Sequence, residues 1–375
     1  MKEVPPHKLK ILCIFIEPAP YILDLLQVIR HQHPELDFRV LFISGSVTQQ
    51  WNTTLDGEYM ELLPISKIAA AWRILRDIKR SDFDWLHLAG WGHPLLMWAL
   101  LVGGVFRRRI SMESDTQLAT QQIKWKEQIK SLLYPRLFQL AELLFPGGSR
   151  QRTFFEFYGV PQTRIRTAQM TVDVSTIFQI IEEFKEKRAA MRINMGLPLN
   201  AVVFVYVGRL ENYKGLDLLL KSFKSVDGEN RRLLIVGDGS MRERVKCAAA
   251  DESHIVYLGG KDFVGVIESL AVSDIAVVPS TFEQWGLVVN EAMAAGLPVI
   301  ASDRVGCVDD LVLDQKTGIV FPSGELNHLV NAMESVAKDS DLRDQMARNG
   351  RKLISGWKLE DEAKIMAAGW HYNGS

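Results

Sequence analysis

Two glutamates, Glu283 and Glu291, are separated by seven residues in the segment EQWGLVVNEAMAAGLPVIAS, which spans residues 283–302. The pattern predicts that a strand ends before this segment and that a helix begins near Leu287, directly after Gly286. The first N–H groups of such a helix are unpaired and lie at its positive dipole end, which suits a phosphate. The two carboxylates could then accept hydrogen bonds from sugar hydroxyls. A helix cap and a surface position are the alternative roles, although the apolar neighbours of Glu291 favour a buried carboxylate.

Glycines and charged residues also follow two other predicted strands. In VYVGRLENYKG the strand ends at Gly208, and Arg209 and Lys214 follow it; two cations at a strand end suit a diphosphate. In LLIVGDGS, Gly237 and Asp238 lie in a turn that is only a fragment of a phosphate-binding loop. A solvated loop and a tight turn would explain these two places equally well. Because ligands bind at the carboxyl ends of parallel strands, the three places together predict a nucleotide diphosphate that bears a polyhydroxy group.

The composition is that of a globular protein with enough residues for two domains. The sequence has 375 residues, 47% hydrophobic and 24% charged, and its net charge of −1 gives no electrostatic reason to expect a nucleic-acid partner. Cys13, Cys247 and Cys307 have no metal-ligand spacing and fit free thiols in a reducing compartment. The apolar run at 9–16 reads as a buried strand rather than a signal peptide, and the run at 95–106 is shorter than the roughly 20 residues that span a bilayer. We therefore expect a cytoplasmic protein.

Strand-like and helix-like patterns alternate along the chain, which predicts βαβ units and parallel sheets with helices on both faces. Strands are predicted at residues 9–16, 38–44, 84–90, 201–209, 231–239 with its turn, 254–260, 274–280, 298–303 and 317–322, with shorter ones inside 107–114 and 167–178. Helices are predicted at residues 21–34, 65–81, 93–105, 117–144, 181–197, 216–226, 264–273 and 325–340. A linker near 174–200 interrupts the alternation, so the predicted fold class is α/β with two doubly wound domains.

The order GRL-x3-KG, VGDG and E-x7-E within residues 200–330 resembles the retaining GT-B glycosyltransferases of family GT4, the glycosyl transferases group 1. The similarity extends to MTVD before the linker and to GW-x-LE at residues 356–360, and it is looser over residues 1–150. It implies the GT-B fold, in which two Rossmann-like doubly wound domains face each other across a cleft. The implied parts are an N-terminal acceptor-binding domain, a C-terminal nucleotide-sugar-binding domain and a segment that crosses back to the first domain, at residues 1–173, 174–354 and 355–375.

The resemblance also implies a role for the matched residues. Arg209 and Lys214 would neutralise the diphosphate as it leaves, and Glu283 would hold hydroxyls of the donor sugar. The other expected donor-binding residues are Gly208, Gly237, Asp238, Leu258, Val264, Gly286, Leu287 and Glu291. Among them the helix start would offer N–H groups to phosphate, the stretch at 256–264 would lie against the base, and Glu291 would bind the ribose hydroxyls.

The N-terminal half departs from the family pattern at two loops. Many members carry a glycine-rich loop after the first strand, where this chain has Glu17 in EPAPY. Many also carry a histidine after a later strand, where this chain has Glu113 and Asp115 in MESDT. His93, between a glycine and a proline, is therefore a candidate catalytic residue on the acceptor side, with a structural or surface histidine as the alternative. His87 lies inside a predicted strand and reads as a core residue.

Two further features concern metal and membrane contact. The sequence Asp82-Phe-Asp84 matches the DxD of metal-dependent transferases, but it precedes a strand instead of following one, so no metal is expected. The basic and aromatic segment 121–145, together with Arg107–Arg109, could make a peripheral contact with an anionic membrane. An ordinary helix with a solvated face is the favoured interpretation of that segment.

The expected activity is the transfer of a hexose-type sugar from a UDP-, GDP- or dTDP-sugar to a glycan, lipid-linked or small-molecule acceptor. The resemblance implies retention of anomeric configuration, no metal and no permanently bound cofactor. The alternatives are a GT-B-fold nucleotide-sugar epimerase or hydrolase, against which GRL-x3-KG and E-x7-E argue, and a non-catalytic nucleotide-sugar-binding protein. The residues leave open the base, the sugar, the acceptor and the oligomeric state.

Overall fold

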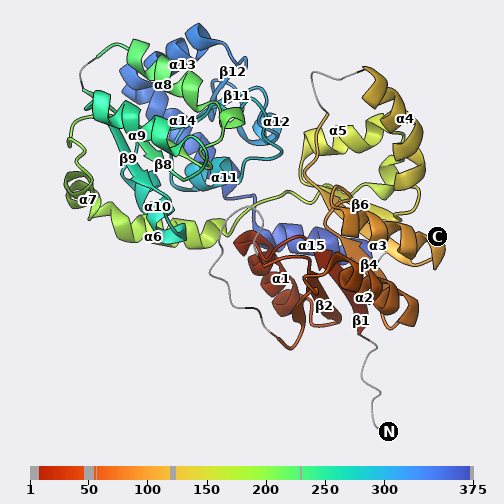
Figure 1. Ribbon diagram of the computed structural model, residues 1–375. Helices are drawn as coiled ribbons and strands as arrows, with labels where there is room; N and C mark the ends of the chain where they lie inside the picture. The colour runs from red at the N-terminus through yellow and green to blue at the C-terminus, as the bar shows by residue number, and fades with distance from the viewer. Residues whose placement is uncertain (1–7, 46–54, 56, 119–123, 229, 372–375) are drawn as a thin grey trace. The chain divides into compact units, whose positions relative to one another are not determined.

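The computed structural model describes residues 8–45, 55, 57–118, 124–228 and 230–371. The chain divides into two units, of which the first holds the residues up to Met170 together with those from Leu359 onward. The second unit runs from Thr171 to Lys358. Each unit is built on one six-stranded sheet whose paired strands are parallel (Figure 1).

The first unit has the strand order β3-β2-β1-β4-β5-β6, which reverses direction between β1 and β4 as in a doubly wound sheet. Its strands are β1 Leu9–Phe15, β2 Leu36–Phe42, β3 Met60–Leu62, β4 Trp85–Leu88, β5 Arg109–Ser114 and β6 Leu143–Pro146. Its helices are α1 Pro20–Gln32, α2 Lys67–Arg80, α3 Pro94–Val105, α4 Lys124–Phe138, α5 Ser149–Phe157, the 3-10 turn η1 Gln162–Arg164 and α15 Leu359–Trp370.

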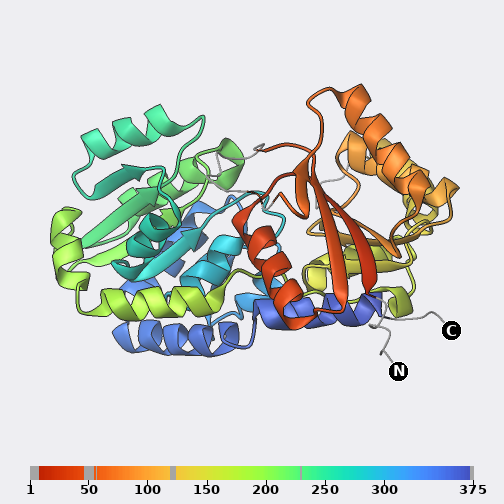
Figure 2. The same ribbon diagram turned by 90° about the horizontal axis from the view of Figure 1, so that it is seen from below.

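Helices cover both faces of this sheet. Side chains from α2 to α5 pack on one face, and α1 and α15 pack on the other. The last helix therefore lies beside the first one, far from it in sequence (Figure 2). Two hydrogen bonds fix α15: Trp85 Nε1 donates to the Trp370 carbonyl at 2.8 Å, and Trp370 Nε1 donates to Ser111 Oγ at 2.8 Å. The end of the described chain is thus part of the core of the first unit.

The second unit has the strand order β12-β11-β10-β7-β8-β9, which reverses direction between β7 and β10. Its strands are β7 Val202–Val207, β8 Arg231–Val236, β9 Ile255–Gly259, β10 Ile275–Val278, β11 Val299–Ser302 and β12 Gly318–Phe321. Its helices are α6 Val174–Lys185, α7 Arg188–Asn194, the 3-10 turn η2 Asn212–Lys214, α8 Leu216–Ser225, α9 Arg242–Asp251, α10 Phe263–Ala271, α11 Leu287–Ala294, α12 Val308–Leu311, α13 Leu326–Lys338 and α14 Ser340–Ile354.

The strands of this sheet are runs of buried β-branched and aliphatic residues, as a sheet covered on both faces requires. Side chains from α8, α9 and α13 pack on one face, whereas α10 and α11 pack on the other, next to α6. Both faces being covered, only the two edges where strands begin and end are open to ligands.

The sequence-based elements were wrong in three places. The helix predicted over 117–144 ends at Phe138, and its last residues belong to β6; residues 119–123 lie outside the described residues. Four buried apolar residues carry no periodicity that separates a short strand from a helix. The strand predicted within 167–178 is absent from that described segment, because Asp173 caps α6 by accepting the Thr176 N–H at 3.0 Å. The helix predicted over 181–197 is broken between α6 and α7.

Candidate donor-binding site

The loops after β7 and β10 carry the strongest of the predicted motifs. These two strands are hydrogen-bonded neighbours at the point where the strand order of the second unit reverses. Loops that leave such a pair run in opposite directions, and ligands of open α/β sheets bind outside that point. Lys214 follows β7, and Glu283 and Gly286 follow β10. The structure therefore brings together residues that are about seventy positions apart in sequence.

Lys214 and Glu283 form an ion pair between these loops. Their side chains keep 13% and 17% of their surface exposed, so the pair is largely shielded from solvent. The backbone of Glu283 is fixed as well, because its N–H donates to the Arg304 carbonyl at 3.2 Å and its carbonyl accepts from the Gly306 N–H at 3.0 Å. Ser280 Oγ lies 3.5 Å from the Glu283 carboxylate. The positions of both charges are therefore fixed by the protein itself.

Arg209 is exposed and makes no ion pair with the residues that the structure describes. Its backbone carbonyl accepts a hydrogen bond from the Tyr206 hydroxyl at 2.7 Å, which fixes the loop but leaves the guanidinium group available. The Tyr213 ring lies between the two cations, 5.7 Å from Arg209 Cζ and 5.5 Å from Lys214 Nζ. Sequence reasoning missed Tyr213, although an aromatic residue between two cations of one loop was a readable signal.

Two glycines allow the loops to approach one another closely. Gly215 has φ 74°, and a Cβ atom there would lie 2.0 Å from the Pro279 carbonyl oxygen of the neighbouring loop. Gly237 has φ 146°, and its Cβ atom would lie 1.8 Å from the Gly208 carbonyl oxygen. No side chain fits at either position, so backbone packs directly against backbone. The predicted residues Gly208 and Gly237 are therefore neighbours.

Helix α11 begins at the same edge of the sheet. Its N-cap is Gly286, with φ 100°, and no side chain caps the helix start by a hydrogen bond. Glu291 lies one turn further on and has no hydrogen-bond or ionic partner among the described residues. Burial raises its pKa from 4.5 to about 7, although part of the side chain remains accessible. A carboxylate without partners at a helix start can accept hydroxyl hydrogen bonds from a ligand.

The remaining predicted donor-binding residues lie after β8, in β9 and in the first turn of α10. Asp238 is exposed; its Oδ1 accepts the Gly239 N–H at 2.8 Å and its Oδ2 pairs with Arg242 at 3.1 Å. These contacts give Asp238 a role in shaping the turn. Leu258 is half-buried in β9, and Val264 is 48% exposed in the first turn of α10. Both could offer apolar surface to a planar group.

A buried hydrogen-bond chain fixes the start of α11, and sequence reasoning missed it. Trp285 Nε1 donates to Asn290 Oδ1 at 3.1 Å, and Asn290 Nδ2 donates to Thr171 Oγ1 at 3.2 Å. Thr171 Oγ1 in turn donates to the Trp357 carbonyl at 3.0 Å, and the two tryptophan rings stack at 6.1 Å. Thr171 at the start of the second unit and Trp357 next to its end are thus tied to the loop that carries Glu283. A lone tryptophan next to a glycine gave no sign of this network.

In the first unit, His93 is the N-cap of α3. Its Nδ1 accepts the Leu95 N–H at 3.2 Å, so the neutral ring carries its proton on Nε2. Burial and then the charge of Lys67 lower the pKa of His93, which favours this neutral form. His93 can therefore donate a hydrogen bond through Nε2 while it caps the helix.

His87 is fully buried in β4, as predicted, and contacts the Glu113 carboxylate at 3.3 Å. Glu113 near the end of β5, Asp115 after β5 and Glu17 after β1 raise the pKa of Tyr21 by their charges, in addition to the larger effect of burial. These residues therefore share the carboxyl edge of the first sheet. Asp84 of the DxD sequence instead accepts the Lys10 N–H at 2.7 Å, at the start of β1.

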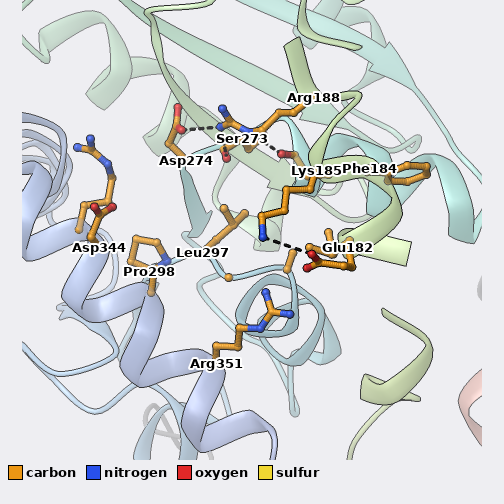
Figure 3. A pocket seen from close by; sticks show the side chains of 16 residues that line it. Glu182, Phe184, Lys185, Arg188, Ser273, Asp274, Leu297, Pro298, Asp344 and Arg351 are labelled. Carbon is orange, nitrogen blue, oxygen red and sulfur yellow. Dashed lines mark hydrogen bonds and ion pairs between the residues drawn. The ribbon is translucent and has the colours of Figure 1, made fainter. Parts of the chain in front are cut away.

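A cavity of about 260 Å³ lies at the opposite edge of the second sheet, where β10 and β11 begin (Figure 3). Its cations are already engaged: Arg188 pairs with Asp274 at 2.7 Å and Lys185 pairs with Glu182 at 3.3 Å. Arg351 lies 4.8 Å from the Phe178 ring. This cavity is a poor site for a diphosphate, because it lies at the edge opposite the carboxyl ends of the strands. In addition, its Lys185 and Arg188 are already neutralised by Glu182 and Asp274.

In the described part of the chain, no helix is long and apolar enough to cross a membrane. Within the same residues, no group of three or more His, Cys, Asp or Glu side chains could hold a metal ion.

Comparisons with known proteins show what this chain resembles. Residues 187–353 match the family model described as glycosyl transferases group 1. A D-inositol 3-phosphate glycosyltransferase of Saccharomonospora viridis is 27% identical over 76% of this chain and 66% of its own length. The N-acetyl-alpha-D-glucosaminyl L-malate synthase of Bacillus anthracis is 27% identical over 48% of this chain and 49% of its own. The chain therefore spans less than two thirds of the curated relatives that it matches.

Solved structures show the same fold. Anabaena HepE, solved in complex with UDP and glucose, has a TM-score of 0.76 at 18% identity and covers 96% of this chain and 98% of its own. The glycosyltransferase WaaG has a TM-score of 0.69 at 15% identity over 98% of this chain. The predicted fold class, GT-B with two Rossmann-like sheets, is confirmed. Residues 187–353 thus match the glycosyl transferases group 1, and the chain as a whole shares the GT-B fold of these solved structures.

Proposed function

We propose that this protein transfers a hexose-type sugar from a nucleoside-diphosphate sugar to a glycan, lipid-linked or small-molecule acceptor, with retention of anomeric configuration. The observation that carries the proposal is the pairing of Lys214 with Glu283 at the strand-order reversal, beside the open start of α11. A diphosphate needs cations and N–H donors, and a sugar needs carboxylate acceptors. This edge of the second sheet offers both.

The charge that develops on the leaving diphosphate would be stabilised by Arg209, Lys214 and the N–H groups of Gly286 and Leu287. As the bond between the anomeric carbon and the phosphate oxygen breaks, its electron pair stays on the phosphate. Fixed positive groups at that place lower the barrier without reorganising, which is usually the largest catalytic contribution. The acceptor hydroxyl attacks from the same face, and its proton passes to the leaving phosphate. This scheme uses no metal.

The two glutamates would divide the rest of the donor between them. Glu283, held by Lys214 and by two backbone hydrogen bonds, would accept hydrogen bonds from hydroxyls of the transferred sugar. Glu291, which has no partner in the described chain, would accept those of the ribose. Leu258 and Val264 would contact the base.

We assign acceptor binding to the first unit, with its boundary near residue 173. Its candidate groups lie at the carboxyl edge of its sheet: the Nε2–H of His93 as a donor, and the carboxylates of Glu17, Glu113 and Asp115 as acceptors. Carboxylates and imidazole N–H groups bind hydroxyls, so the chemistry fits a polyhydroxy acceptor.

Nucleotide release with a panel of UDP-, GDP- and dTDP-sugars tests the proposal. In the presence of EDTA, at least one donor should release its nucleoside diphosphate faster when a glycan or lipid-linked acceptor is added. The anomeric configuration of the product, read from its NMR coupling constants, should equal that of the donor. An inverted product would exclude retention, and an epimerised donor with no nucleotide release would indicate an epimerase. Binding without turnover of any donor would indicate a nucleotide-sugar-binding protein.

A further inference from the structure

The buried His87 of the first unit contacts the carboxylate of Glu113 at the edge of the sheet. We propose that His87 is a positioning residue, which holds one oxygen of Glu113 so that the other accepts a hydrogen bond from a hydroxyl group of the acceptor. The proposal rests on the proposed transferase function, because it concerns the acceptor of that reaction. It gives a role to a histidine that the sequence alone identifies only as a core residue.

The strand register places His87 and Ser111 side by side on one face of the first sheet. In the pairing of β4 with β5, His87 lies opposite Ser111, and Glu113 follows two residues later on the same face. His87 and Ser111 are fully buried, whereas Glu113 keeps 28% of its side chain exposed. The three side chains therefore connect the core with the carboxyl edge of the sheet, where ligands of such sheets bind.

The hydrogen bonds of this group fix the tautomer of a neutral His87 ring. Trp370 Nε1, which can only donate, donates to Ser111 Oγ at 2.8 Å. Among the described residues, the Ser111 hydroxyl has one acceptor, His87 Nδ1 at 2.9 Å, so the ring carries its proton on Nε2. This Nε2–H donates to Glu113 Oε2 at 3.3 Å. The other tautomer would leave the serine hydroxyl unpaired and would direct a nitrogen lone pair at a carboxylate.

Three aromatic rings pack against the His87 imidazole. The ring centroids of Trp370, Phe15 and Phe145 lie 5.4, 5.8 and 6.1 Å from that of His87. Rotation of the imidazole would therefore disturb the packing of α15, β1 and β6. A donor that is held in this way restricts the carboxylate that it contacts, and such restriction is what a precisely placed binding group requires.

Glu113 has one carboxylate oxygen left for a ligand. In the part of the chain that the structure describes, its side chain receives a hydrogen bond from His87 alone. Burial, followed by the charges of Glu113 and two neighbouring carboxylates, raises the pKa of Tyr21. Those neighbours, Asp115 and Glu17, repel the charge of Glu113 and cannot donate to it when ionised. Glu113 therefore depends on His87 for its position, and its second oxygen can accept from a hydroxyl group.

Kinetics with the full chain test the proposal. The assay is nucleotide release with the UDP-, GDP- or dTDP-sugar and the glycan or lipid-linked acceptor on which the wild type is most active. Glu113→Ala and His87→Phe should each raise the acceptor KM about tenfold, because a hydrogen bond to a charged group is lost, whereas the donor KM should change less than about twofold. His87→Gln, whose amide group can still donate to Glu113, should recover most of this loss.

The double variant separates positioning from a purely structural role. In the Glu113→Ala background, His87→Phe should have no further effect on the acceptor KM, because the ring has no carboxylate to hold. The matched control is Cys13→Ala, which truncates the buried residue opposite His87 in the pairing of β1 with β4. The Cys13 side chain makes no hydrogen bond to a described residue. Cys13→Ala should therefore lower the melting temperature and leave the acceptor KM within about twofold.

Nitrogen NMR of the histidine rings shows the tautomer without any substrate and does not depend on whether His87→Phe folds. In the wild type, the ring signals that disappear in His87→Gln should show a proton on Nε2. A ring without this proton would overturn the proposal, as would an unchanged acceptor KM in His87→Phe or additive effects in the double variant. In these cases the transferase function would stand. Absence of turnover with every donor and acceptor would instead refute that function, and the proposal with it.

Discussion

Lys214 and Glu283 form an ion pair that joins the loops after β7 and β10, the two strands at which the sheet of the second unit reverses its order. The pair places a cation and a carboxylate side by side at the edge where ligands of such sheets bind. If a donor binds there, phosphate oxygens contact the ammonium group and sugar hydroxyls contact the carboxylate. The two residues would then act as one unit.

Substitution of either partner should lower turnover strongly and to a similar extent. We expect Lys214→Met and Glu283→Gln each to reduce kcat by about 10²- to 10³-fold, the usual effect of removing one preorganised group from a developing charge. The double variant should lose less than the product of the two single effects, because the residues share one interaction. Nucleotide release measures all three.

The matched control is an exposed ion pair of the same unit, Lys246 with Glu243 at 2.9 Å. Lys246→Met and Glu243→Gln should leave turnover unchanged, since exposed pairs of this kind contribute little. Full activity in both Lys214→Met and Glu283→Gln would contradict the assigned site.

A methyl group at Gly215 should damage the site without touching any charged residue. Gly215→Ala places a Cβ atom 2.0 Å from the Pro279 carbonyl oxygen, so the loops after β7 and β10 must move apart. Gly228 also has a positive φ, 108°, but a Cβ atom there meets no atom within 4 Å. Gly228→Ala therefore lowers the free energy of unfolding only through backbone strain, by about 1 kcal/mol. In urea unfolding, Gly215→Ala should be about 1–3 kcal/mol less stable than Gly228→Ala. Equal stabilities would show that the loops are not in contact.

Two substitutions distinguish the helix-capping role of His93 from its proposed role as a hydrogen-bond donor to the acceptor. His93→Asn keeps a good helix cap, so its stability should stay within about 0.5 kcal/mol of the wild type, whereas His93→Ala should lose about 1 kcal/mol. Because asparagine does not reproduce the Nε2–H donor, His93→Asn should still raise the acceptor KM or lower kcat about tenfold if His93 contacts the acceptor. If His93→Asn has wild-type kinetics, His93 serves only as the helix cap and does not contact the acceptor.

The sequence alone predicted the parts of this molecule that repeat a strong local pattern. Buried runs such as VVFVYV predicted β7 and its neighbouring strands. The glycines and charged residues after these runs identified Lys214, Glu283 and Gly286 as candidate site residues. Parallel strands place their carboxyl ends at one edge, so the clustering of these residues followed from the alternation of elements.

The parts that sequence reasoning missed depend on contacts between distant segments. β6 is four buried residues whose pattern is equally that of a helix, and only pairing with β5 decides it. Trp285, Asn290 and Thr171 form a chain across about 120 positions, which no local pattern encodes.

Because of Glu291, the stability of the protein should fall as pH rises, whereas its affinity for the nucleotide should increase. Its pKa is raised to about 7 in the folded protein, against 4.5 for the free side chain. Below about pH 4.5 both states hold the proton, so the residue has no effect on stability. Between pH 4.5 and pH 7 the unfolded chain releases a proton that the folded chain retains, so the free energy of unfolding falls as pH rises. Well above pH 7 the buried charge costs the folded state on the order of 3 kcal/mol.

Glu291→Gln removes this charge while keeping the shape of the side chain. In urea unfolding, the variant should match the wild type near pH 4 and exceed its stability increasingly from there up to pH 8. Its affinity for a nucleoside diphosphate, measured by titration calorimetry, should fall, because an amide is a weaker acceptor for ribose hydroxyls than a carboxylate. Wild-type affinity should rise from pH 6 to pH 8 as Glu291 ionises, and the affinity of the variant should not follow it. A variant that is less stable at pH 8, or that binds nucleotide as tightly as the wild type, would contradict the ribose assignment. A gain in stability together with a loss of affinity is what a carboxylate kept for its ligand should show.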